Sequence, residues 1–265
     1  MGLDATVYCN CWKEKKTAPL PFDSVLLVEE EGTLYLNETG LSKQEITQLN
    51  QQLSNWKETA CPHPYFEQCS LRVGNWFAVS EFKGLLYQLG AKRFPILYNG
   101  IPDNNGGCIE AECAQQGLQE LALFNELVSS QTGWSLIDAQ TGEELYRCAS
   151  AENAEIAWSL KETYAFGKQG FLITERKTNA IIFQSVYFSQ TVLPAQKEEA
   201  RICFTDLKSK KVCYGSIEIG AAQKKRAEIL QVQQRPLKAG DFWIVQPLKQ
   251  LFTASLETGN PIYWH

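Results

Sequence analysis

The sequence predicts an α+β fold: a mixed or antiparallel sheet with about four packed helices and an inserted module rich in β-hairpins. The chain has 265 residues, of which 44% are hydrophobic and 11% aromatic, so it can form a sizeable core. Apolar residues recur at helical spacing mainly in the first half, whereas the second half consists of short apolar runs separated by turn residues. Helices and strands therefore separate along the chain, which is typical of α+β proteins.

The first elements are predicted to be strands. Residues 3–12 alternate between apolar and polar side chains, as expected for a strand with one buried face. Two further apolar runs, 24–29 and 33–36, flank Gly32 and predict a hairpin, because glycine readily adopts the backbone angles of a tight turn.

Two helices follow in the first half. Ser42 and Glu45 form a capping-box pattern, and apolar residues at helical spacing extend this helix to about residue 57. Asn75 is suited to cap a second helix, which Gly90 is suited to end. Both helices should pack one apolar face on the core.

The next segments predict two further helices. Residues 94–98 read as a short extended piece, and a helix is expected over about 109–129 after a polar, glycine-rich loop. Near the end of the chain, Pro247 suits the first turn of a helix and Gly259 suits its end. Residues 261–264 are expected to return to the sheet as a last short strand.

The second half is predicted to form hairpins. The paired runs are 134–137 with 144–148, 170–175 with 180–188, and 201–206 with 211–219. A helix is expected at 152–163, and no internal repeat is apparent. We therefore expect residues 1–130 and 236–265 to form an α+β core, with 131–235 as a hairpin-rich β module packed on it as one compact body.

Composition narrows the class of function. Thirty acidic and 25 basic residues give a net charge of −5, which argues against nucleic acid as a ligand and favours a basic partner or solubility alone. We find neither a targeting segment nor an apolar run of membrane-spanning length, so a cytoplasmic protein without a membrane is expected. The nine cysteines should then be thiols, and an odd number does not suit a closed disulfide framework.

Four residues predict a metal site. Cys9 and Cys11 lie two apart, as do Cys61 and His63, and two such pairs can complete the tetrahedral Cys₃His set that zinc prefers. Structural zinc pairs usually have two to four intervening residues rather than one, so the pattern is suggestive and not diagnostic. Packing of the cysteines in the core is an alternative, since free cysteine is among the most buried residue types, and redox or catalytic use is another.

Several short sequence motifs resemble those of an uncharacterised family of bacterial proteins for which no activity is known. They are the opening MGLDATVYCNC, ACPH at 60–63, GN at 74–75, FPILYNG at 94–100 and ASLETGNPIYW at 254–264. The likeness covers about 1–127 and 236–265, and it implies that 131–235 is an elaboration absent from shorter relatives. In that family a histidine follows the Tyr-x-Gly word, where this chain has Ile101 and Pro102. If that histidine serves a site, Cys108 is the candidate substitute.

Cys108 is also a candidate nucleophile. A thiol just before a helix meets unpaired N–H groups and the positive end of the helix dipole, which favours the thiolate. His63 is the only internal histidine and could act as its base in a hydrolase or transferase. However, no recognised cysteine-hydrolase motif surrounds Cys108. In addition, one histidine cannot readily serve both as metal ligand and as base.

Two classes of function remain. The first is a non-catalytic binding protein, of the immunity or adaptor kind, with a structural zinc site and a protein partner that the sequence does not identify. The second is an enzyme that uses Cys108 with His63. The common nucleotide-binding, zinc-protease and serine-hydrolase motifs are not found, and four protein ligands leave a zinc ion no open position for water. The first class is therefore favoured.

Overall fold

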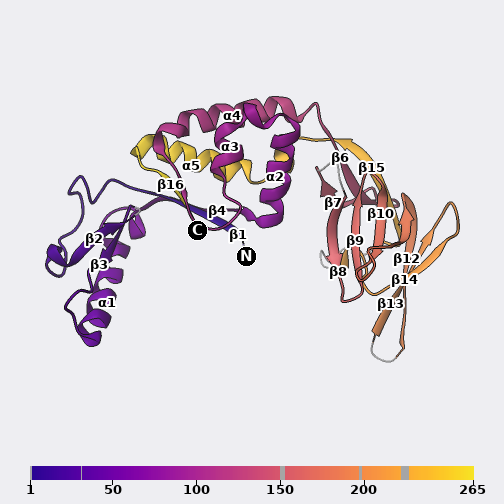
Figure 1. The fold of residues 1–265 in the computed structure, drawn as a ribbon, viewed down its shortest axis with the longest axis horizontal. Coiled ribbons are helices and arrows are strands. Elements are labelled where there is room, and N and C mark those ends of the chain that lie inside the picture. The colour runs from indigo at the N-terminus through magenta and orange to yellow at the C-terminus, as the bar shows by residue number, and fades with distance from the viewer. Residues whose placement is uncertain (1, 31, 150–152, 197–198, 222–226) are drawn as a thin grey trace. The chain divides into compact units, whose positions relative to one another are not determined.

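The computed structural model describes residues 2–30, 32–149, 153–196, 199–221 and 227–265. It divides into two compact units: a helical unit, Met1–Glu126 with Ala239–His265, and a hairpin unit, Leu127–Lys238. The α-helices lie in the helical unit beside a small antiparallel sheet, and the hairpin unit carries two further antiparallel sheets (Figure 1), so the predicted α+β fold is confirmed. The expected packing of the hairpin module on the core stays a prediction.

The helical unit is built on a small antiparallel sheet with the strand order β4-β1-β16-β5. Its strands are β1 (Gly2–Tyr8), β4 (Glu67–Asn75), β5 (Cys108–Ile109) and β16 (Ile262–Trp264). Leu3, Ala5 and Val7 of the central strand are fully buried, as their alternation predicts. The last strand pairs with the first, Ala5 opposite Trp264, so the two ends of the chain meet in one sheet (Figure 1).

The helices of this unit begin and end mostly where local signals place them. They are α1 (Lys43–Thr59), α2 (Trp76–Gln88), α3 (Pro95–Gly100), α4 (Ala114–Val128) and α5 (Val245–Thr258). Ser42 and Glu45 form the predicted capping box, and the Asn75 side chain accepts a hydrogen bond from the Ala78 N–H. Gly259 ends α5 with a φ of 70°, a left-handed conformation that glycine adopts without strain.

One prediction in this unit is wrong, and one helix starts later than predicted. The segment predicted as extended at 94–98 forms α3, because Pro95 suits the first helical turn and the buried Glu120 carboxylate accepts hydrogen bonds from the N–H groups of Ile96 and Leu97. The helix predicted over about 109–129 is present, but Cys108 and Ile109 pair in the sheet as β5 and Ala111–Cys113 form a 3-10 turn, so α4 begins at Ala114.

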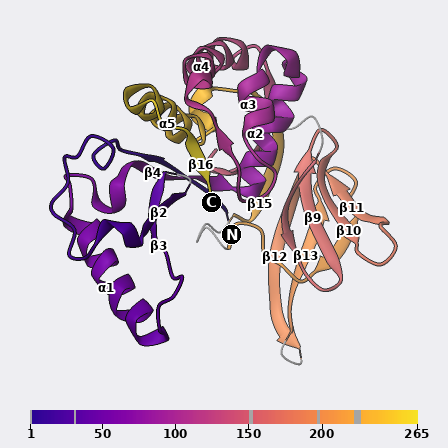
Figure 2. The same cartoon turned by 60° about the vertical axis from the view of Figure 1, so that its left-hand side comes forward.

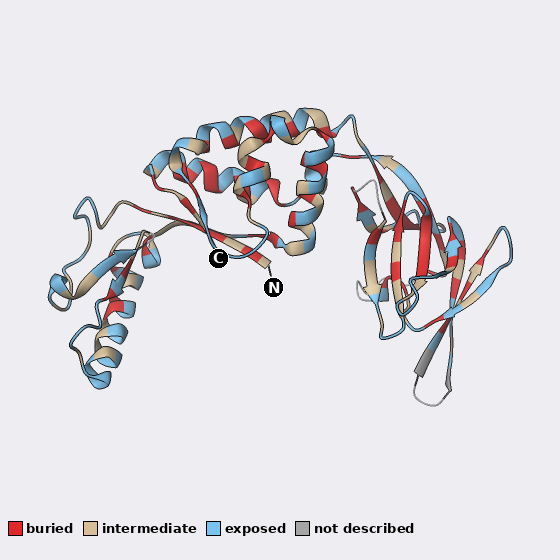
Figure 3. Ribbon diagram, in the orientation of Figure 1, coloured by how far each residue is buried: buried red, intermediate tan, exposed pale blue. Residues whose placement is uncertain are grey.

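A second, smaller cluster of the helical unit joins α1 to the hairpin of β2 (Leu27–Glu30) and β3 (Thr33–Leu36). We call its seven buried residues the small core: Cys9, Leu34, Leu36, Leu53, Trp56, Ala60 and Phe66. The Trp56 ring centroid lies 5.4 Å from that of Phe66, and its indole N–H donates to the Ala18 carbonyl. Only two residues of α1 are buried, so this helix is mostly exposed (Figure 3).

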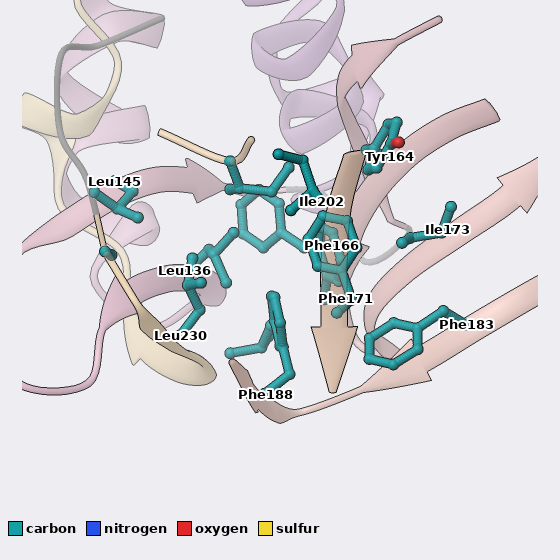
Figure 4. Close-up of a cluster of buried hydrophobic side chains, with 14 of the residues drawn as sticks. Leu136, Leu145, Tyr164, Phe166, Phe171, Ile173, Phe183, Phe188, Ile202 and Leu230 are labelled. Atoms are coloured by element: carbon teal, nitrogen blue, oxygen red, sulfur yellow. The ribbon is translucent and has the colours of Figure 1, made fainter. Parts of the chain in front are cut away.

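The hairpin unit contains two antiparallel sheets, ordered β11-β10-β9-β8 and β14-β13-β12-β15-β6-β7. The strands are β6 (Thr132–Asp138), β7 (Glu144–Cys148), β8 (Ala154–Trp158), β9 (Glu162–Gly167), β10 (Gly170–Glu175), β11 (Ile181–Ser185), β12 (Tyr187–Gln196), β13 (Glu199–Asp206), β14 (Val212–Gly215) and β15 (Ile229–Pro236). Their inward side chains form a core rich in phenylalanine (Figure 4), in which Phe171 stacks on Phe188 with ring centroids 4.4 Å apart.

The helix expected at 152–163 is wrong for the part that the structure describes. Residues 154–158 and 162–167 form β8 and β9, joined by a tight turn in which the Ser159 N–H donates to the Glu162 carbonyl. Alanine and glutamate favour a helix locally, but pairing of β9 with β10 decides the outcome.

Three hairpins of this unit repeat one turn, a repeat that was not predicted from the sequence. In β6–β7, β10–β11 and β13–β14 an acidic residue is followed three positions later by threonine or serine, and then by a residue with positive φ. The sets are Asp138, Thr141 and Gly142; Glu175, Thr178 and Asn179; Asp206, Ser209 and Lys210. In each, the N–H of the third residue donates to the carbonyl of the first.

Candidate metal centre

The first half of the centre follows β1. The Cys9 N–H donates to the Phe66 carbonyl at 2.7 Å, which extends the pairing of β1 with β4 by one step. The predicted strand then stops: the chain turns at once, with the Lys16 N–H donating to the Cys11 carbonyl. Cys9 is therefore buried beneath the turn, and Cys11 is half-buried on it.

The second half follows the end of α1. Cys61 and His63 lie in a short loop whose backbone Pro62 and Pro64 restrict. Tyr65 and Phe66 then adopt left-handed φ angles of 56° and 65°, which non-glycine residues adopt only at a cost in energy. This reversal directs the Phe66 ring into the small core.

These two loops bring the four predicted residues together. Their ligand atoms all lie within 4.8 Å of one another, and we call them the Cys₃His cluster. Cys9 Sγ lies 3.9 Å from Cys61 Sγ, and Cys11 Sγ lies 3.7 Å from His63 Nδ1. A zinc tetrahedron with Zn–S near 2.3 Å and Zn–N near 2.0 Å has S–S edges of about 3.8 Å and S–N edges of about 3.5 Å. The cluster could thus hold a metal ion such as zinc.

Burial disfavours the thiolate form of two of the cluster's cysteines, Cys9 and Cys61. Burial raises the pKa of the Cys9 thiol to about 12, and burial likewise raises the pKa of Cys61. Zinc would coordinate the thiolates and so displace their protons. The donor set also selects the metal, because three sulfurs and an imidazole suit zinc, whereas magnesium and calcium require oxygen ligands.

An asparagine network that was not predicted supports the first loop. The Asn260 side chain donates to the Tyr8 carbonyl at 2.7 Å and to the Asn10 side chain at 2.9 Å. Asn10 in turn donates to the Thr258 carbonyl. The segment between α5 and β16 therefore fixes the turn that carries Cys9 and Cys11. The only signal in the sequence was the Asn-Pro pair after Gly259, a turn motif that indicates no partner.

Cys108 lies elsewhere in the sheet. It is exposed on β5, opposite Tyr263, and its Sγ lies 3.4 Å from a Glu110 carboxylate oxygen. The strands β5 and β4 form opposite edges of the sheet, about 14 Å apart at three strand spacings, and His63 lies in the loop that leads into β4. The thiol in contact with His63 is Cys11. The geometry therefore does not bring Cys108 and His63 together as nucleophile and base, nor does it place Cys108 before a helix.

Comparison of the chain with protein-family models, with curated proteins and with solved structures found no match. The resemblance in the terminal words accordingly stays a prediction. Among the described residues, no helix has both the length and the apolar character that crossing a bilayer requires.

Proposed function

We propose that this protein is a non-catalytic protein-binding protein in which Cys9, Cys11, Cys61 and His63 hold a structural zinc ion. The observation that carries the proposal is the convergence of these four donors, from two loops far apart in the sequence, within 4.8 Å of one another. Two of the donor pairs, Cys9 with Cys61 and Cys11 with His63, lie near the edge lengths of a zinc tetrahedron. Four protein ligands fill the coordination sphere, so the ion would brace the fold and leave no position for a reacting water.

The surroundings of the cluster support a bracing role. Cys9 belongs to the small core, and Cys11 and Cys61 pack against it. Seven buried side chains are few for the segment of about sixty residues that contributes them, and small cores of this kind commonly need a metal or disulfide in addition to apolar burial. Zinc would link the turn after β1 to the loop after α1. Both segments contribute residues to the small core or pack against it.

Metal analysis tests the zinc assignment. The purified full-length protein should contain about one zinc ion per chain, and Cys61→Ser should lower both the zinc content and the melting temperature. Cys108→Ser serves as the matched control, because this exposed thiol lies outside the cluster and its loss should change neither. Protein that is free of zinc and keeps its full stability in chelator would contradict the proposal.

Binding of a protein partner is supported by charge. The helical unit has ten Lys and Arg residues against 18 Asp and Glu, a net charge of −8, whereas the hairpin unit has 15 against 12, a net charge of +3. Charge of one sign attracts partners of the other sign and speeds their association. The helical unit is thus the part of the chain suited to a basic partner.

A further inference from the structure

In the helical unit, α2 and α3 lie side by side (Figure 2). A cleft of about 810 Å³ lies between one face of α2 and the segment that contains α3. Trp76, Ser80, Gly84 and Tyr87 line it at helical spacing along α2, a length of about 16 Å. Tyr98 of α3 lines the facing wall. We call this the α2–α3 cleft.

Gly84 is the most informative residue of the cleft. Glycine in the interior of a helix destabilises the helix relative to alanine, so its presence calls for a reason. The fold provides none: the φ of Gly84 is not positive, and a Cβ built there would meet no atom within 4 Å. Any side chain at this position would instead enter the cleft. Glycine keeps the cleft open, which indicates that something occupies it.

The aromatic walls are free to contact a ligand. Tyr87 is 67% exposed, and its ring centroid lies 6.3 Å from that of Tyr98. Neither tyrosine hydroxyl, nor the indole N–H of Trp76, makes a hydrogen bond to the residues that the structure describes. Tyrosine and tryptophan in this state combine apolar area with an available polar group, which is the composition of peptide-binding surfaces.

The residues described along the cleft include one mostly buried cation, Lys83, and one exposed anion, Asp103. The Lys83 ammonium donates to the Ile101 carbonyl and to the Asp103 carboxylate, and it lies over the Tyr98 ring, so it is part of the wall. The Lys83 side chain is only 15% exposed, whereas that of Asp103 is 81% exposed. Lys83 contacts Oδ1 of this carboxylate, so a cation of a ligand would pair with Asp103 through Oδ2 at the exposed rim.

The cleft continues into a second hollow of about 600 Å³, which shares Trp76 and Asp103 with it and also contains Asp4 and Arg72. A groove of this length suits an extended chain better than a compact small molecule, which is usually enclosed on most sides. Among the charged residues that line the two hollows, Lys83 and Arg72 balance Asp103 and Asp4. The preference for a basic chain therefore comes from the net charge of −8 of the surrounding unit.

We infer that the α2–α3 cleft binds a basic peptide segment of a protein partner, with an aromatic or long aliphatic side chain seated over Gly84 and a Lys or Arg paired with Asp103. The inference rests on the proposed binding function and names its surface and its partner class. It is independent of the zinc ion.

Selection from a phage-displayed library of random peptides on the full-length protein tests this assignment. The selected peptides should be rich in Lys and Arg around one large apolar residue, and their affinity, measured with synthetic peptides, should fall as salt is raised. Gly84→Trp fills the cleft and should weaken binding by at least about tenfold, while circular dichroism verifies that the variant is folded. Asp103→Asn, which fills nothing, should also weaken binding and reduce the salt dependence.

Gly240→Trp is the matched control. Gly240 is an exposed glycine of the same unit with no atom within 4 Å of its Cβ position, and it does not line the cleft, so binding should be unchanged. Peptides that bind Gly84→Trp as tightly as the wild type, or that are acidic, would overturn the cleft assignment and leave the binding function standing. A library that yields no binding peptide would count against both, while the zinc assignment depends only on the metal analysis.

Discussion

The hairpin unit and the small core of the helical unit hold their buried side chains by different means. Sixteen buried residues cluster in the hairpin unit, and Phe171 alone lies within 6.4 Å of four other aromatic rings, measured between centroids. The small core has seven buried residues and the Cys₃His cluster at its edge. Burial of this much aromatic surface stabilises a unit by itself, whereas a core of seven residues needs a cross-link.

Removal of the metal should give the largest effect, and it should be confined to the small core. Structural zinc sites contribute on the order of 10 kcal/mol to the domains that they fold. Treatment with a chelator should therefore abolish hydrogen-exchange protection in α1 and β3 while the amides of β10 stay protected. Equal protection in α1 before and after zinc removal would show that the small core is stable on apolar burial alone.

Truncation of a central aromatic ring should destabilise the hairpin unit and leave the small core unchanged, the opposite of metal removal. Phe171 is fully buried among aromatic rings, so Phe171→Ala should destabilise the hairpin unit by about 3–5 kcal/mol in denaturant unfolding. The zinc content of the protein should not change. Leu160→Ala is the control, since Leu160 is 92% exposed and its truncation should alter stability little. A loss of zinc in Phe171→Ala would show that the two regions are not independent.

Elements with local signals could be predicted from the sequence, and those fixed by distant partners could not. The caps of α1 and α2 lie within three residues of the groups they bind, and both helices were predicted. The start of α3 depends on Glu120, more than twenty residues away, and β9 depends on its pairing with β10. Such partners are invisible to propensity and spacing.

The metal centre shows the same division. The two pairs of donors could be predicted from their residue types, and the structure brings them together. The alternation at 3–12 predicted that Cys9 and Cys11 would lie on one strand, but β1 ends at Tyr8. Turns at Cys11 and at Tyr65 set the geometry, and Asn260 from the other end of the chain supports it. The repeat of the hairpin unit, by contrast, has a local signal, an acidic residue three positions before Thr or Ser, although the strands around it differ.

Acid should weaken the hairpin unit through its repeated turns. Hydrogen bonds from the Ser185 hydroxyl and the Ser209 N–H lower the pKa of the buried Asp206 from 3.8 to about 2. A carboxyl whose pKa is lower in the folded state stabilises the protein above its unfolded pKa, so this contribution should be lost as the pH falls from about 5 to 2. The free energy of unfolding of the hairpin unit should fall by at most about 2 kcal/mol over this pH range. Denaturant unfolding, monitored through the exposure of Phe171, measures this change. Asp206→Asn should flatten this dependence, and an unchanged slope would exclude Asp206 as its source.

Substitutions at the third position of the repeated turn should have the smallest effect on stability. They allow two of the hairpins to be compared with each other. Lys210 has a φ of 63° and Gly142 a φ of 76°, and only glycine adopts this region without strain. Lys210→Gly should therefore stabilise the hairpin unit, and Gly142→Ala should destabilise it, each by about 1 kcal/mol. A Cβ at Gly142 would meet no atom within 4 Å, so its cost is one of backbone conformation and not of packing. If both variants changed stability in the same direction, the shared turn would not be governed by this backbone angle.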